Sequence, residues 1–132
     1  MFIMSNEEVL FEIKKINDYL ARCSWMDFEF CQMNGFKIVM AGSIDQSYSK
    51  YAINIEFEHP NYVSSLFSWQ ADTSKTFIAL ANNEEAVDIS GKFNIEHGNY
   101  IFKIYAESFK PVPMFIAAKK IACKILDEKP FK

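Results

Sequence analysis

Strict alternation of apolar and polar side chains over residues 51–58, Y-A-I-N-I-E-F-E, constrains the fold more than any other stretch of this chain. Because successive side chains of a β-strand point to opposite faces of a sheet, the pattern predicts a strand with two unlike faces. The apolar face would carry Tyr51, Ile53, Ile55 and Phe57. The opposite face would carry Ala52, Asn54, Glu56 and Glu58. His59-Pro60 should end the strand, because proline cannot donate a hydrogen bond to a ladder.

A β-hairpin is predicted ahead of this strand. Asn34-Gly35 separates two strand-like runs, and this pair tolerates positive φ at both central positions of a tight turn. On the first run, the core face would carry Met26, Phe28 and Phe30. On the second run, it would carry Phe36, Ile38 and Met40. The outward face of the first run then holds two carboxylates, Asp27 and Glu29.

Four further strands are predicted, at residues 62–70, 76–81, 86–96 and 99–106. Aromatic and β-branched content favours a strand in the first of these segments, although a helix is the alternative there. One side of it would carry Val63, Ser65, Phe67 and Trp69. His97-Gly98 supplies the turn of a second hairpin, which joins the last two segments. In that hairpin Phe93 and Ile95 would face the core, and Glu96 would face outward.

Two amphipathic helices are predicted, one near each end of the sequence. Ser5-Asn6-Glu7-Glu8 has the pattern of a capping box, and apolar residues follow at spacings of three and four, which predicts a helix over residues 6–22. Pro113 suits the first turn of a second helix over residues 113–127. Its apolar stripe would be Met114, Ala118, Ile121 and Ile125. Its outer side would carry Lys119, Lys120 and Lys124.

These elements fit a single α+β domain over residues 1–132. Hairpin connections imply a mostly antiparallel meander sheet of about six strands. The N-terminal and C-terminal helices each need a surface for their apolar stripes, so both are expected to pack on one face of the sheet. The other face, which carries the acidic side chains, would then meet solvent.

Charge is distributed unevenly, since residues 24–109 carry a net charge of −6 and residues 110–132 carry +4. Arg22 is the only arginine, whereas proteins that bind nucleic acid favour arginine and a basic surface, so we expect no nucleic-acid partner. The longest apolar runs are far too short to span a membrane. Three cysteines without a C-x-x-C pair, and no signal-peptide pattern, predict a cytoplasmic protein.

The sequence offers no recognisable motif for catalysis or cofactor binding. The four glycines form neither a dinucleotide-binding nor a phosphate-binding loop, and the two histidines, His59 and His97, lack neighbours at metal-ligand spacing. We therefore expect a protein that is not an enzyme and that uses no cofactor and no metal. The enzymatic alternative would assemble a site from distant residues such as Asp27, Glu29 and His59.

Carboxylates at the outward positions of neighbouring strands are the feature that needs a function. Acidic surfaces attract basic partners and accelerate their encounter. The pattern therefore predicts that the chain binds a basic protein. The predicted partner-binding residues are Asp27, Glu29, Asn54, Glu56, Glu58 and Glu96.

One strand entry, S-W-M-D-F-E-F at residues 24–30, is similar to a W-x-D-x-E pattern in some immunity proteins of bacterial toxin systems, including contact-dependent growth inhibition. The resemblance covers seven of the 132 residues. It implies a non-enzymatic protein that binds a toxin domain, such as a nuclease, and neutralises it by direct occlusion. Two alternatives stay open: a small acidic chaperone or adaptor with an apolar groove, and a protein that stacks single-stranded nucleic acid on an open sheet face.

Overall fold

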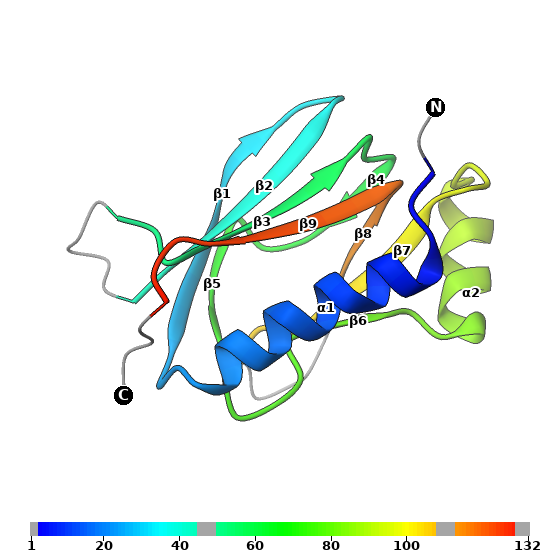
Figure 1. The fold of residues 1–132 in the computed structure, drawn as a ribbon. Helices are drawn as coiled ribbons and strands as arrows, with labels where there is room; N and C mark the ends of the chain where they lie inside the picture. The colour runs from blue at the N-terminus through cyan, green and yellow to red at the C-terminus, as the bar shows by residue number, and fades with distance from the viewer. Residues whose placement is uncertain (1–2, 45–49, 108–112, 129–132) are drawn as a thin grey trace.

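The structure, a computed structural model, describes residues 3–44, 50–107 and 113–128. This part of the chain contains two helices and nine strands, and the strands form two antiparallel sheets (Figure 1). The chain is therefore an α+β protein, as predicted, but it has two sheets in place of one meander. None of the helices within the described ranges is long and apolar enough to cross a membrane.

The five-stranded sheet consists of β1 (Met26–Met33), β2 (Lys37–Ser43), β3 (Ile53–Glu58), β5 (Ser68–Ala71) and β9 (Lys120–Ile125). Its strand order is β5-β1-β2-β3-β9. The four-stranded sheet consists of β4 (Tyr62–Ser64), β6 (Ile78–Leu80), β7 (Tyr100–Ile104) and β8 (Met114–Ala118). Its strand order is β4-β8-β7-β6. The two helices are α1 (Asn6–Ala21) and α2 (Asn83–Phe93).

Two stretches of chain run through both sheets and bend at a common corner. β3 leads into β4 and β8 leads into β9, and the two stretches pair with each other on both sides of the corner. Glu58 pairs with Lys120 and Tyr62 pairs with Ala117, so three residues on one side oppose two on the other. The extra residue makes a β-bulge, which bends the strand. His59 lies in it with a φ of 53°, a conformation that histidine adopts more readily than most residues.

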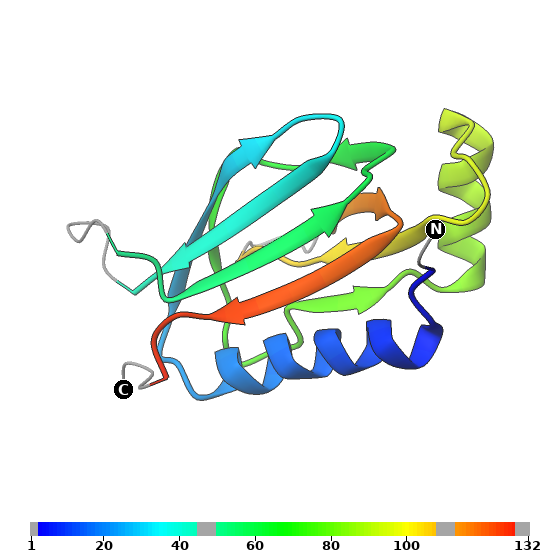
Figure 2. The ribbon, with the colours of Figure 1, turned by 45° about the horizontal axis from the view of Figure 1, so that its top comes forward.

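α1 lies along two sheet edges, β9 and β6 (Figure 2). Glu12 Oε1 accepts a hydrogen bond from the backbone N–H of Cys123 on β9 at 2.8 Å. Asn17 Oδ1 accepts from the backbone N–H groups of Phe77 and Ile78, and its Nδ2 donates to the Ile78 carbonyl. Side chains of one helix thus satisfy backbone groups that edge strands would leave unpaired.

The main core fills the space between α1 and the two sheets. The helix contributes Val9, Ile13, Ile16, Tyr19 and Leu20. Among the most deeply buried residues of the sheets are Phe28, Met40, Ile55, Phe57, Phe102 and Ile116. Phe28 stacks on Phe77 with ring centroids 4.6 Å apart, and Phe57 meets Phe102 edge to face at 5.1 Å. These aromatic contacts link the five-stranded sheet to the chain around the four-stranded sheet.

Several predicted elements are confirmed. The capping box of Ser5 and Glu8 forms and begins the helix predicted over residues 6–22. The turn at Asn34-Gly35 joins β1 to β2, and the strand predicted over residues 51–58 is β3. The strands predicted at 76–81 and 99–106 are β6 and β7.

The second helix lies elsewhere than predicted. α2 occupies most of the segment predicted as a strand at 86–96, and it begins at a capping box formed by Asn82 and Glu85. Residues 113–127, predicted as a C-terminal helix, form β8 and β9 instead. α2 packs on the four-stranded sheet through the cluster around Ile89, whereas α1 packs against the main core on the other side of that sheet. The helices therefore do not share one face of a sheet.

Phe36, Phe67 and Phe93 were predicted to face the core, but all three are exposed. At Phe36 and Phe67 the reason is that the chain leaves a sheet there. The segment predicted as one strand at 62–70 forms β4 in one sheet and β5 in the other. Trp69 and Phe67 were predicted on one side of that strand, but Trp69 is buried in β5, whereas Phe67 precedes β5 and is 75% exposed. Phe36 lies in the turn between β1 and β2 and is 78% exposed, whereas Ile38 and Met40 are buried as predicted.

Candidate functional site

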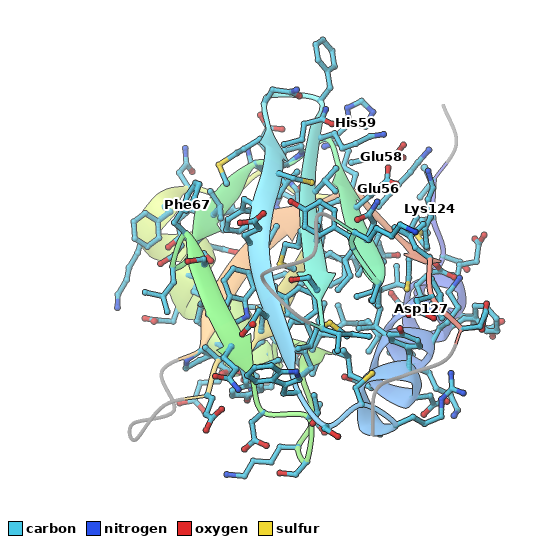
Figure 3. All side chains as sticks on the ribbon, turned by 90° about the vertical axis from the view of Figure 1, so that its left-hand side faces the viewer. Glu56, Glu58, His59, Phe67, Lys124 and Asp127 are labelled. Carbon is cyan, nitrogen blue, oxygen red and sulfur yellow. The ribbon has the colours of Figure 1, made fainter. Side chains whose placement is uncertain are left out.

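Five of the six residues predicted to bind a partner lie on one surface. They are Asp27 and Glu29 on β1 and Asn54, Glu56 and Glu58 on β3. Paired residues of neighbouring strands point to the same face, and the register places Glu29, Ala41 and Asn54 in one row across the sheet. We call this surface, the side of the five-stranded sheet that points away from the core, the outer face. Figure 3 looks onto it.

Glu96, the sixth predicted residue, does not lie on the outer face. It follows α2, which packs on the four-stranded sheet, and its backbone N–H donates to Asn61 Oδ1 at 3.1 Å. Its side chain is exposed and lines a hollow between α2 and that sheet. The structure therefore brings five of the predicted residues together and separates the sixth from them.

The acidic residues of β3 are paired with lysines, which the sequence did not predict. β9 lies next to β3 and places Lys120 and Lys124 on the outer face. Glu56 has ion pairs with Lys37 at 2.9 Å and with Lys124 at 3.0 Å, and Glu58 lies 3.8 Å from Lys120. Figure 3 shows Glu56, Glu58 and Lys124 side by side. Lys120 and Lys124, which were predicted on the outer side of a helix, thus join Lys37 in neutralising the carboxylates of β3.

Glu56 is buried, whereas the alternation placed it in solvent. Only 8% of the residue is exposed, and its neighbours across the sheet are Val39 and Ala122. The hydrogen bond from Lys37, together with that from Lys124, holds the pKa of the Glu56 carboxyl below its ordinary value of 4.5. The side chain is therefore ionised at neutral pH and belongs to a structural ion-pair network.

Glu29 is anchored by Tyr51, whose hydroxyl donates a hydrogen bond to Glu29 Oε1 at 2.5 Å. Because β2 separates β1 from β3, the Tyr51 side chain must cross the outer face over β2. Ala41 of β2, in the same row as Glu29, is completely buried. The hydrogen bond with Glu29 raises the pKa of Tyr51 to about 12. The prediction that Tyr51 faces the core is wrong, because this residue precedes β3.

Asn54 leaves an unsatisfied acceptor on the outer face. Its Oδ1 is buried and has no hydrogen-bond partner among the residues that the structure describes. A buried acceptor without a donor destabilises the folded state by about 1–3 kcal/mol. This oxygen has almost no accessible surface, so a partner that covers the outer face would not reach it.

Additional carboxylates gather at the end of the outer face formed by β1 and β5. Asp27 pairs with Gln70 of β5, and the backbone N–H of Glu107 donates to the Gln70 carbonyl at 2.8 Å. Asp72 directly follows β5 and lies 3.8 Å from Lys75. Asp72 and Glu107 could not be predicted as site residues, because neither lies in an alternating strand pattern. We call the region around Asp27, Glu29, Asp72 and Glu107 the acidic end.

A shallow hollow of about 480 Å³ lies at the acidic end. Trp25, from the W-x-D-x-E segment, lines it and is 40% exposed. Asp72, Thr73 and Glu107 also line it. An aromatic side chain beside carboxylates can bind a lysine or arginine side chain through its ring face and through charge-assisted hydrogen bonds.

The residues considered for an enzymatic site do not meet. Asp27 lies opposite Ser43 at one end of β2, whereas His59 follows the residue opposite Lys37 at the other end. At about 3.3 Å per residue, this separation along the strand is about 20 Å. Within the described ranges, no group of three or more His, Cys, Asp or Glu side chains could hold a metal ion.

Comparison of the chain with protein-family models, with curated proteins and with solved structures gives no match. The geometry and charge of the outer face are therefore the basis for assigning a function.

Proposed function

We propose that this chain is a non-enzymatic immunity protein that binds a basic toxin domain, such as a nuclease, and neutralises it by direct occlusion. The observation that carries the proposal is the collection of five predicted partner-binding residues, from Asp27 to Glu58, on one face of one sheet. Occlusion needs a stable scaffold and a complementary surface, without any catalytic group. Such a protein would act in the cytoplasm, the compartment predicted from the cysteine content.

The acidic end is the part of the outer face best suited to attract a basic partner. Glu56 and Glu58 have ion pairs with lysines, whereas the acidic end adds the negative charges of Glu29 and Glu107 beside the pair of Asp72 with Lys75. Long-range attraction of a basic partner would therefore come from the acidic end, and it would weaken as salt is added. The hollow beside Trp25 would receive a lysine or arginine side chain of the partner.

The β3–β9 part of the outer face would contribute to specificity. Alternating carboxylates and ammonium groups fix the register of a partner, because a shifted partner would bring like charges together. The two parts of the face would thus divide attraction and positioning between them.

Charge reversal at the acidic end tests the proposal. We expect Asp27→Lys combined with Glu29→Lys to weaken partner binding by about tenfold or more, because like charges then face the basic partner. The partner would be recovered by pull-down from a lysate that co-expresses the reading frame directly upstream. The dissociation constants of the wild type and of the double variant would be measured by calorimetry at low and at physiological salt. Binding by the wild type should depend more strongly on salt than binding by the double variant.

A matched control reverses two exposed carboxylates of α2, Glu84→Lys with Asp88→Lys. It changes the net charge of the chain by the same amount as the double variant at Asp27 and Glu29. The control should bind the partner as the wild type does. Equal weakening in both double variants would show a non-specific charge effect and contradict the outer face as the binding surface. Failure to recover any basic partner would contradict the immunity function itself.

A chaperone or adaptor function is the second candidate, and exposed apolar side chains favour it. They lie in the β1–β2 hairpin, in β4 and in the connection from β4 to β5: Met33, Phe36, Val63, Leu66 and Phe67. The Phe30 N–H donates to the Phe67 carbonyl at 3.3 Å, which places Phe67 beside β1. Phe67 projects beside β5 in Figure 3. Exposed apolar groups of this kind often mark an interface.

Sedimentation equilibrium separates the two candidates. A chaperone-like adaptor should form a dimer at micromolar concentration, and Phe36→Ser with Phe67→Ser should dissociate it, because both side chains would be removed from the apolar contact. An immunity protein that uses the outer face should stay a monomer in both forms. A dimer that survives the double substitution would contradict the apolar surface as its interface.

A further inference from the structure

Four strands lie at the edges of the two sheets, and three of these edges are covered by other parts of the chain. The Glu12 carboxylate on α1 accepts a hydrogen bond from the N–H of Cys123 on β9, and Asn17 bonds to backbone groups of β6. The backbone N–H of Glu107 donates to the Gln70 carbonyl on β5. β4 pairs with β8 on one side, and no strand of the described chain pairs with its other side, which we call the β4 edge. An edge of this kind presents unpaired backbone N–H and C=O groups.

The β4 edge lies on the side of β2. β3 leads into β4 and β8 leads into β9 at the corner, so the pair β4–β8 continues the pair β3–β9. On the other side of β3, the five-stranded sheet continues with β2, β1 and β5. The four-stranded sheet has no strand at the corresponding position in the described chain. A strand added to β4 would extend the smaller sheet in the direction in which the larger sheet already continues.

Apolar side chains beside the β4 edge are exposed on the core side of the sheet. Val63 lies opposite Ile116, which is completely buried in the main core, yet Val63 itself is 36% exposed. Leu66 and Phe67 follow β4 on the way to the five-stranded sheet, and more than half of each residue is exposed. Apolar surface therefore continues from the main core to the β4 edge and meets solvent there.

The opposite face of the sheet also presents apolar side chains at the β4 edge. Tyr62 lies opposite Ala117, on the side of the four-stranded sheet where α2 packs. The centroid of its ring lies 4.6 Å from that of Phe93, the last residue of α2, which is 54% exposed. Exposed apolar side chains therefore flank the β4 edge on both faces.

The segments around the β4 edge carry no charged side chain. Between His59 and Asp72 the sequence contains no Asp, Glu, Lys or Arg, and the same is true from Phe30 to Phe36 at the tip of the β1–β2 hairpin. Natural edge strands are often protected from pairing by charged side chains, and β4 lacks this protection. A charged group placed against this surface would lose its hydration without gaining an ion pair, so a matching partner is uncharged and apolar where it touches.

We propose that the β4 edge binds an extended, uncharged and apolar segment of a second protein, which adds a strand to the four-stranded sheet. The added strand bonds to the open backbone groups of β4. Its side chains alternate between the two faces, so they contact Leu66 and Phe67 on the core side and Tyr62 and Phe93 on the other side. A helix would leave the backbone groups of β4 unpaired and would contact only one face. This site does not use the outer face, which belongs to the five-stranded sheet.

Titration of the ¹⁵N-labelled protein with a synthetic peptide, followed through the amide resonances, tests the site on the isolated chain. The peptide alternates valine and threonine and has a lysine at each end for solubility. We expect saturable shifts confined to β4, residues 65–67, the β1–β2 hairpin and the end of α2. In a control peptide of equal charge, proline replaces two adjacent central residues, so that at least one lost N–H would have faced β4. This control should bind at least about tenfold more weakly.

Three outcomes would overturn the proposal. Equal binding of the two peptides would show that backbone pairing plays no part. Shifts centred on another surface, or no shifts at millimolar peptide, would show that the β4 edge is not a binding site. Shifts of the same amides when the protein alone is concentrated would show that a second copy of this chain covers the edge.

Substitutions on the two faces locate the contacts. Phe67→Ser on the core side and Phe93→Ser on the α2 side should each weaken peptide binding by about fivefold or more, because each removes apolar surface that the added strand covers. Phe11→Ser makes the same change at an exposed position of α1, which lies along other sheet edges, and should bind as the wild type does. Thermal unfolding checks that each variant folds. A loss of affinity in Phe67→Ser alone would mean that the peptide contacts one face only, which contradicts strand addition.

Discussion

Replacement of Phe57 with alanine is expected to lower the free energy of unfolding by about 3–5 kcal/mol. Phe57 is completely buried in β3, which lies between β2 and β9. Its ring meets Phe102 of the other sheet edge to face at 5.1 Å, so the substitution removes a contact between the two sheets as well as apolar area. Urea unfolding of both proteins, followed by circular dichroism, gives the difference in free energy.

Phe67→Ala is the matched control, because it removes the same atoms from a side chain that is 75% exposed. We expect this variant to differ from the wild type by less than about 0.5 kcal/mol. A near-neutral effect of Phe57→Ala would contradict the position of this ring in the core. A large effect of Phe67→Ala would mean that its ring is covered in solution.

Elements with strong local signals were predictable from the sequence. The capping box at Ser5 and Glu8 satisfies backbone groups at the start of α1, so its position follows from residues three apart. Asn34-Gly35 sets the turn between β1 and β2 in the same local way. β3 was predictable because one of its faces packs in the core while the other is polar.

The helix at α2 was missed although the sequence contains its signal. Asn82 and Glu85 have the spacing of a capping box, and Ala86 and Ile89 follow at helical spacing. The pair His97-Gly98 predicts the turn of a hairpin, and residues 86–96 were therefore predicted to form a strand. Gly98 does have a positive φ of 90°, but it lies in the connection from a helix to β7.

The C-terminal strands were mistaken for a helix for a different reason. β8 and β9 are separated by Lys119 alone, at the corner where the chain passes from one sheet to the other. Buried side chains alternate along each strand, and the alternation shifts by one residue between β8 and β9. The shift gives Met114, Ala118 and Ile121 the spacing of a helical stripe. Ala117 is also completely buried, so β8 has no polar face that would mark it as a strand.

Because β9 was predicted as a helix, the ion pairs that its lysines make with Glu56 and Glu58 could not be predicted. The positions of Glu56 and Glu58 on one face follow from alternation within β3 alone. Their neutralisation follows from the pairing of β3 with β9, which lies more than sixty residues away in the sequence. Strand pairing over such distances depends on the closed shape of the core, and no local pattern around Glu56 encodes it.

Replacement of Glu56 with lysine should therefore be strongly destabilising, by about 2–4 kcal/mol, because removing one member of a buried ion-pair network leaves like charges together. The new ammonium group would lie beside Lys37 and Lys124 at a position where only 8% of the residue is exposed. Glu58→Lys makes the same charge change on the same strand, but its pair with Lys120 is longer and more exposed, so we expect a loss below about 1 kcal/mol. Equal effects in urea unfolding would contradict the difference in burial.

The pH dependence of Glu56→Gln isolates the charge of this network. The folded-state pKa of Glu56 lies below its ordinary value of 4.5, because Lys37 and Lys124 donate hydrogen bonds to the ionised form. A carboxyl with a depressed pKa stabilises the fold fully above the unfolded-state pKa, and this contribution is lost as the pH falls through the folded-state pKa. We therefore expect the stability difference between wild type and Glu56→Gln to be constant from pH 7 to about 5.5 and to shrink below about 4.5. A difference that persists unchanged at pH 3 would mean that Glu56 stabilises the sheet through packing and neutral hydrogen bonds, and that its ion pairs contribute nothing.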